Sequence, residues 1–274
     1  MQNASNDDKT NSPRRDKPAI VLVASGTSDP RGIEVFSHVD DKVGSRYAGH
    51  QVLWAFTGRF VLAKLKKLGT KVAGGDAASV DEVVERLKRE GCRRAVLQSL
   101  HVAPGGDCDR LAAVDTGPMR TTVGDSLLSD DRSINAVVDA IEDEVRPDAF
   151  NVVVCHGSRK NPAVGRQLAA FADNAEDAYK NLVVCSLIGQ PGSGKLAEAK
   201  RRDSNLSRVH FIPLMLTAGL HMQDDVLGDK PESWKNILSA AETTHARPLG
   251  YNRKVLDVYL AHLDAALAEL GIDR

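Results

Sequence analysis

The sequence is poor in cysteine, contains no long hydrophobic run and has no excess of either charge. Its four cysteines lie far apart and form no C-x-x-C pair, which excludes a disulfide scaffold or a structural zinc knot and indicates a reducing compartment. No apolar run approaches the ~18–20 residues that a membrane-spanning helix needs. With 36 Lys and Arg against 37 Asp and Glu, the chain lacks the basic surplus of proteins that bind nucleic acid or anionic membranes. We therefore expect neither among its partners.

What remains is an ordinary globular composition, 42% hydrophobic and 27% charged, over 274 residues. This length suits one large domain or two of moderate size. Residues 1–17 are polar throughout and include no apolar core of a secretory signal, so we expect a disordered tail and a cytoplasmic protein. The oligomeric state stays open, a homo-oligomer included.

From Pro18 onward, short apolar runs alternate with longer amphipathic segments. Several runs have no polar face, as in strands buried on both sides of a parallel sheet, and the amphipathic segments follow helical i, i+3, i+4 spacing. Ser79 and Ser133 are the expected N-caps of two helices. The alternation predicts an α/β fold. The expected strands are 19–24, 51–56, 94–99, 151–155, 182–188 and 208–216, and the expected helices are 80–90, 133–144, 163–178 and 254–270.

The two parts of the chain are similar to each other. The segment 21–27 matches 152–158 in character, and 99–107 matches 213–221 in the same order. We therefore expect two similar α/β halves, residues 18–147 and 148–274, that face each other across a cleft. Open α/β sheets bind ligands beyond the carboxyl ends of their strands, so the site is expected there.

Two histidines stand at expected strand ends of the second half. His156 precedes a glycine that leaves room for its ring, and His221 follows a strand and a glycine turn. Either one alone could equally be a loop residue that bonds a carbonyl or faces solvent. As a pair they predict a site for one divalent metal with open coordination positions, typical of a catalytic centre. His101 ends an expected strand of the first half and is expected to line the opposite wall.

The segment 189–195 reads G-x-x-x-x-G-K, the frame of a phosphate-binding loop. The next residue is Leu196, where that motif needs Ser or Thr to ligate magnesium. No apolar run ending in Asp offers a second magnesium ligand. We interpret the segment as a glycine-rich turn between a strand and a helix, and expect no nucleotide.

Six short pieces, in this order and spacing, resemble the anaerobic-type sirohydrochlorin cobaltochelatases. These are class II tetrapyrrole chelatases, which insert cobalt without nucleotide hydrolysis. The resemblance extends from Pro18 nearly to the end of the chain. The matching pieces are Ser25-Gly26-Thr27-Ser28, Ala55-Phe56-Thr57, Gln98-Ser99-Leu100-His101, His156-Gly157, the run 213–221, and Ser233-Trp234-Lys235.

The resemblance implies two flavodoxin-like halves with parallel sheets facing across a cleft that receives the macrocycle. It implies that His156 and His221 ligate the metal. Because His156 stands directly on a buried strand with Gly157 behind it, we expect it also to be catalytic, as a proton acceptor of fixed geometry. The family's third ligand is a glutamate in a Glu-Gly-x-Pro element, which here reads Ile188-Gly189-Gln190-Pro191. Ile188 cannot ligate a metal, and Leu220 replaces the acidic residue usual before the second histidine. As substrate-binding residues we expect Ser25, Thr27, His101 and Gln190.

The implied reaction is insertion of Co²⁺ into sirohydrochlorin for anaerobic cobalamin biosynthesis, with the divalent metal as a substrate and no nucleotide. Two alternatives stay open. One is insertion of Fe²⁺ for sirohaem, because the same macrocycle serves both products. The other is a non-catalytic tetrapyrrole or metal carrier that has lost the carboxylate ligand.

Overall fold

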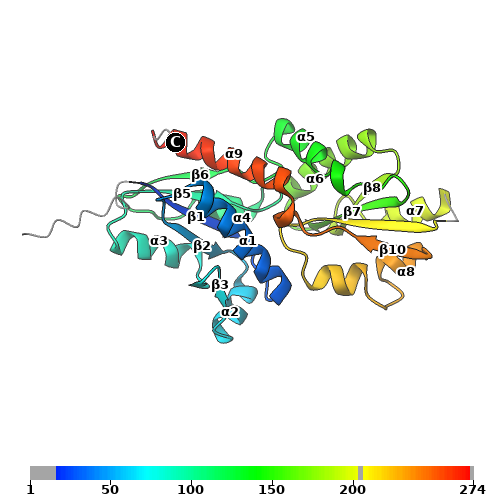
Figure 1. Cartoon of the computed structure of the whole chain (residues 1–274), viewed down its shortest axis with the longest axis horizontal. Helices are drawn as coiled ribbons and strands as arrows, with labels where there is room; N and C mark the ends of the chain where they lie inside the picture. The colour runs from blue at the N-terminus through cyan, green and yellow to red at the C-terminus, as the bar shows by residue number, and fades with distance from the viewer. Residues whose placement is uncertain (1–16, 203–205, 272–274) are drawn as a thin grey trace, which may run out of the picture.

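The chain forms two parallel sheets, seen in a computed structural model that describes residues 17–202 and 206–271 (Figure 1). The expected tail, residues 1–17, lies outside the described residues except for Lys17. The first sheet has the strand order β2-β1-β5-β6 and the second β10-β9-β7-β8. Without the small β3–β4 hairpin, the described part of each half has four strands. Numbered along the chain within each half, they lie side by side in the order 2-1-3-4, which is the flavodoxin-like order. The fold is thus α/β with two flavodoxin-like halves.

The elements follow the expected alternation of strands and helices. The first half contains β1 (Ala19–Ala24), α1 (Pro30–Arg46), β2 (Val52–Phe56), α2 (Arg59–Lys67), the hairpin β3 (Lys71–Val72) and β4 (Gly75–Asp76), α3 (Val80–Arg89), β5 (Arg94–Ser99), α4 (Gly106–Ala112), β6 (Arg120–Gly124) and α5 (Asp131–Ala140). The second contains β7 (Phe150–Ser158), α6 (Pro162–Ala178), β8 (Leu182–Gly189), α7 (Gly194–Arg202), β9 (Arg208–Leu214), α8 (Trp234–Leu238), β10 (Glu242–His245) and α9 (Arg253–Glu269).

The central strand β1 is buried on both faces, which explains its unbroken apolar run. In β1, Ile20 and Leu22 pack into one core while Val21 and Val23 pack into another on the opposite face. The core that holds Ile20 continues into the second half, where it includes Val153 of β7. Because side chains alternate across a strand, every position of β1 has an apolar environment. The two sheets therefore share one hydrophobic core.

One of the two expected N-caps is confirmed and the other is wrong. Ser79 caps α3 in a capping box: its hydroxyl accepts from Glu82 N at 3.2 Å, while Glu82 accepts from Ser79 N at 2.8 Å. Ser133 instead lies inside α5, and the cap is Asp130, whose carboxylate accepts from Ser133 N at 2.7 Å. A short carboxylate satisfies the free amides of a first turn as well as a hydroxyl does.

The last helix departs from the expected division at residue 147. Although α9 follows the second sheet in sequence, it packs against β5 and β6 of the first (Figure 1). Tyr259 donates its hydroxyl to Leu100 O at 3.0 Å, and Thr122 donates to Ala266 O at 2.8 Å. Conversely, α5 of the first half packs against α6 of the second half. The amphipathic pattern marked the buried face of α9 but could not say which sheet covers it.

In the part of the chain that the structure describes, no helix is both long and apolar enough to cross a membrane.

Candidate metal centre

A cleft of about 490 Å³ opens where the carboxyl ends of the two sheets meet. Its walls include the loops after β1 and β5 in the first half, and the last residues of β7 and the loop after β9 in the second. Four parallel strands thus deliver their terminal residues to one space, the usual ligand position in open α/β sheets. Ser25, Thr27, His101, His156 and His221 all line it.

The structure brings the two histidines together. The rings of His156 and His221 have centroids 5.1 Å apart and planes inclined at 74°. Both side chains are exposed to the cleft, and that of His221 is 51% exposed. His156 can take its position because Gly157 follows it with a φ of 72°, and a Cβ on Gly157 would lie 2.0 Å from Ile188 O. Only glycine fits there.

Hydrogen bonds set the tautomer of both imidazoles. His156 Nδ1 lies 3.0 Å from Gly157 O, and His221 Nδ1 lies 2.7 Å from Asp225 Oδ2. A carbonyl or carboxylate oxygen only accepts, so each Nδ1 carries the proton and donates it. In a neutral imidazole the lone pair then sits on Nε2. Both rings are therefore held in the form in which Nε2 ligates a metal.

Asp225 is a site residue that the sequence analysis missed. It lies four residues after His221, on the π-helical turn Met222–Val226. A carboxylate on the outer nitrogen of a ligating histidine orients the ring and raises its basicity. A His-x-x-x-Asp spacing on a helical segment was the available signal.

The position that holds glutamate in the resembled family offers no ligand here. Ile188 pairs with Gly157 in the β7–β8 ladder, so its backbone lies beside that of His156. Among the described residues, no group of three His, Cys, Asp or Glu side chains is placed to hold a metal. In the described part of the chain, the cleft thus offers two imidazoles as candidate metal ligands and no third side chain of these types placed to join them.

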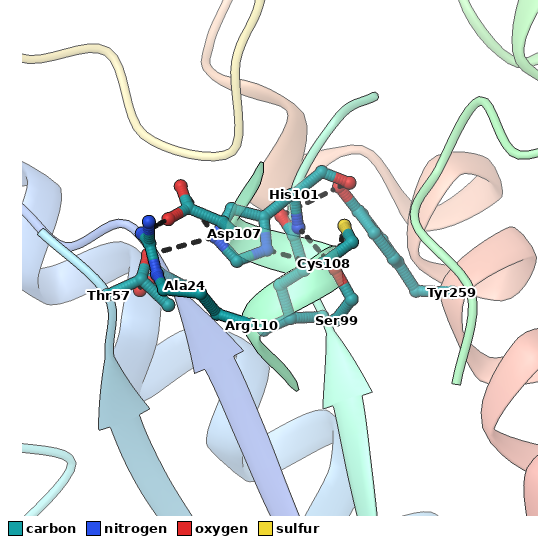
Figure 2. A network of polar contacts seen from close by, with 9 residues as sticks. Ala24, Thr57, Ser99, His101, Asp107, Cys108, Arg110 and Tyr259 are labelled. Atoms are coloured by element: carbon teal, nitrogen blue, oxygen red, sulfur yellow. Dashed lines mark hydrogen bonds and ion pairs between the residues drawn. The ribbon is translucent and has the colours of Figure 1, made fainter. Parts of the chain in front are cut away.

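His101 lies on the opposite wall in a dense polar network (Figure 2). Its Nδ1 lies 2.9 Å from Ser99 Oγ, and its Nε2 lies 3.1 Å from Thr57 Oγ1 and 3.6 Å from Asp107 Oδ2. Asp107 in turn pairs with Arg110. Burial lowers the pKa of His101. The negative charge of Asp107 raises this pKa, and the positive charge of Arg110 lowers it. Because both ring nitrogens have partners, His101 shapes the wall and does not offer a free lone pair.

The other expected substrate residues have different environments. Ser25 is exposed at the cleft, whereas Thr27 is only 8% exposed and its Oγ1 accepts from Asp29 N at 3.1 Å. Gln190 is absent from the cleft wall, since its Oε1 accepts from Gly192 N at 3.0 Å within the turn after β8. The side-chain oxygen of Gln190 is therefore used within this turn.

The glycine-rich segment 189–195 is a turn from β8 into α7, as the sequence predicted. Its Lys195 Nζ forms an ion pair with Glu176 Oε1 of α6 at 2.7 Å. The lysine is thus directed toward α6, and its charge is balanced by a protein carboxylate.

Comparisons with known proteins agree with this geometry. A model of the cobalt chelatase (CbiK) family matches residues 18–268. The sirohydrochlorin cobaltochelatase CbiKC of Nitratidesulfovibrio vulgaris is 26% identical over 270 residues, covering 93% of this chain and 92% of that protein. The sirohydrochlorin cobaltochelatase of Salmonella typhimurium is 26% identical over 265 residues, covering 92% and 97%. The solved structure of SirB from Bacillus subtilis with Fe³⁺ shares the fold, with a TM-score of 0.63, 15% identity and coverage of 93% and 98%. The chain therefore belongs to the cobalt chelatase (CbiK) family.

Proposed function

We propose that this chain is a sirohydrochlorin cobaltochelatase, an enzyme that inserts Co²⁺ into sirohydrochlorin without nucleotide hydrolysis for anaerobic cobalamin biosynthesis. The observation that carries the proposal is the pair of exposed imidazoles, 5.1 Å apart in the cleft of a cobalt chelatase family member. Both curated relatives bear this activity in their names. The metal is a substrate, and the second substrate is the tetrapyrrole.

The two Nε2 atoms would hold the incoming ion, and water or the macrocycle nitrogens would complete its coordination. Insertion releases two protons from the pyrrole nitrogens for each divalent ion that enters the ring. As the ion moves to the macrocycle, the Nε2 lone pairs of His156 and His221 become free. Neutral imidazoles can then accept these protons and pass them to water. Ligation and proton acceptance thus follow each other on the same atoms.

The missing carboxylate bears on the choice of metal. Two neutral nitrogen ligands attract a divalent ion less strongly than a set with a carboxylate, but imidazole suits metals such as cobalt and iron. Among divalent ions bound by nitrogen ligands, Co²⁺ binds more tightly than Fe²⁺. The donor set present here therefore favours Co²⁺ as the metal substrate. Ser25, exposed in the cleft wall, is retained as a proposed substrate contact.

An absorbance assay tests the proposal. Purified protein is mixed anaerobically with sirohydrochlorin and Co²⁺ or Fe²⁺, and the macrocycle spectrum is followed with and without nucleotide. We expect conversion above the uncatalysed rate, faster with Co²⁺ and independent of nucleotide, and its loss in the His156→Ala/His221→Ala double variant. Tight macrocycle binding with an uncatalysed rate would instead identify a carrier. Faster insertion of Fe²⁺ would identify a ferrochelatase.

A further inference from the structure

A hydrogen bond joins the segment that carries His221 to the opposite half of the molecule. Gln223 Nε2 donates to Asp29 Oδ2 at 2.6 Å, although the two residues are 194 positions apart. Asp29 is only 8% exposed, and its other oxygen, Oδ1, accepts from Arg31 N at 2.9 Å to cap α1. Oδ2 also forms an ion pair with the Arg31 guanidinium at 3.3 Å. The carboxylate is thus fixed by the first half, and its Oδ2 accepts from Gln223 as well. A hydrogen bond to a carboxylate is among the stronger ones in proteins.

The loops on either side of this bond are also close, through the side chain of Thr27. A Cβ on Gly219 would lie 3.3 Å from Thr27 Oγ1, while a Cβ on Gly32 would lie 2.5 Å from Thr27 Cγ2. The buried Thr27 side chain is therefore held between two glycines, one from each half. The loop after β9 rests directly on the loop after β1, so the first half supports the segment that leads into His221.

The same segment orients the imidazole. Met222 N donates to Gly219 O at 3.1 Å, and Asp225 holds His221 Nδ1 at 2.7 Å. Gln223 lies between His221 and Asp225 in the chain. A shift of this short turn would move the ring and its orienting carboxylate together. His156, in contrast, stands on β7, whose neighbours β8 and β9 fix it from both sides.

We infer that the Gln223–Asp29 hydrogen bond is a positioning contact for His221, which sets the separation of the two imidazoles by anchoring the His221 segment to the first half. The inference rests on the proposed role of His221 as a metal ligand. It makes Gln223 and Asp29 positioning residues rather than ligands, and it predicts that their loss affects metal capture more than turnover.

The first test is Gln223→Ala, measured by Co²⁺ titration without the macrocycle and by initial rates of insertion. We expect the half-saturating Co²⁺ concentration to rise about tenfold, as one strong hydrogen bond is lost, and kcat to change less than about twofold. The matched control is Gln167→Ala. Gln167 also donates an amide bond between the halves, to Ser129 O at 3.2 Å, and does not line the cleft. If Gln223→Ala and Gln167→Ala change the half-saturating Co²⁺ concentration equally, the Gln223–Asp29 bond contributes only to general stability, and the inference is overturned.

A second test reverses the pair without changing the net charge. Asp29→Asn keeps an oxygen for the α1 cap but turns an amide NH₂ toward Gln223, and it should weaken Co²⁺ binding like Gln223→Ala. The double variant Asp29→Asn/Gln223→Glu restores a donor and an acceptor, and it should recover Co²⁺ affinity to within about twofold of wild type. Gln223→Glu alone, which places two carboxylates together, should not improve Co²⁺ binding. An improvement there would overturn the inference. So would a double variant that binds Co²⁺ no more tightly than Asp29→Asn alone, because the Arg31–Asp29 ion pair is lost equally in both.

His221→Ala separates this inference from the proposed function. If His221→Ala abolishes Co²⁺ binding while Gln223→Ala binds as tightly as wild type, only the positioning role fails. If His221→Ala binds Co²⁺ as wild type does, the metal role of His221 fails, and the positioning role fails with it.

Discussion

His221 donates its Nδ1–H to Asp225 across 2.7 Å, and this bond leaves the lone pair on Nε2 of a ring that lines the cleft. Removing the carboxylate should let the ring rotate and change tautomer. We expect Asp225→Ala to raise the half-saturating Co²⁺ concentration about 10–100-fold, the usual cost of losing such a partner. Asp225→Asn, which keeps an acceptor oxygen, should lose less. Calorimetric titration with Co²⁺ measures both.

Asp224→Ala is the control for Asp225, because it removes one exposed carboxylate from the same turn. Co²⁺ affinities that fall equally in the Asp224 and Asp225 variants would indicate a general charge effect and refute the orienting bond.

The two histidines should fail in different ways when each is replaced. His156 stands on β7 and is the better-fixed proton acceptor, so His156→Ala should lower kcat about 10²-fold or more even at saturating Co²⁺. His221 follows the β9 loop, so His221→Ala should chiefly raise the Co²⁺ requirement, with part of the rate recovered at high metal. Initial rates over a matrix of metal and macrocycle concentrations separate kcat from KM. If His156→Ala and His221→Ala lose the same fraction of kcat, and added Co²⁺ restores neither rate, this division of roles is refuted.

Restoring a carboxylate at position 188 should strengthen metal capture. The backbone of Ile188 lies beside Gly157, next to His156. We expect Ile188→Glu to bind Co²⁺ about tenfold more tightly, because a third ligand with a negative charge joins two neutral ones. Ile188→Gln has the same reach without the charge and should gain much less. An unchanged affinity in Ile188→Glu would show that position 188 does not reach the ion.

His210 should make stability depend on pH far from the cleft. It is 2% exposed in β9, and burial, together with the nearby charges of Arg146 and His245, lowers its pKa from 6.5 to about 4. The unfolded chain therefore takes up this proton at a higher pH than the folded chain. Its contribution to the free energy of unfolding is complete above pH 6.5 and is lost as the pH falls toward 4.

His210→Gln cannot titrate and should remove this part of the pH dependence, worth ~3 kcal/mol at about 1.4 kcal/mol per pKa unit. Urea unfolding of both proteins at pH 5 and pH 7 measures the part lost between these pH values, about 2 kcal/mol. Parallel pH profiles for wild type and variant would contradict the assignment to His210.

The sequence by itself determined the strands, the strand-end histidines and the class of fold. The strand β1 begins and ends where its apolar run does, because both of its faces are buried. β5 also begins and ends as expected, although it buries the polar side chains of Gln98 and Ser99. His156 was predictable because it ends an apolar run and precedes a glycine. These signals are local: each depends on residues a few positions apart.

Only the tertiary structure decided which sheet covers α9, where Gln190 directs its oxygen, and what holds His221. An amphipathic pattern indicates that one face of a helix is buried but does not identify the sheet that covers it. The contacts of α9 with β5 and β6 therefore came from the structure alone. The bond from Gln223 to Asp29 spans 194 residues and has no local signature. Contacts of this kind arise when two separately patterned halves pack together, and the separation of the two imidazoles is set at that step.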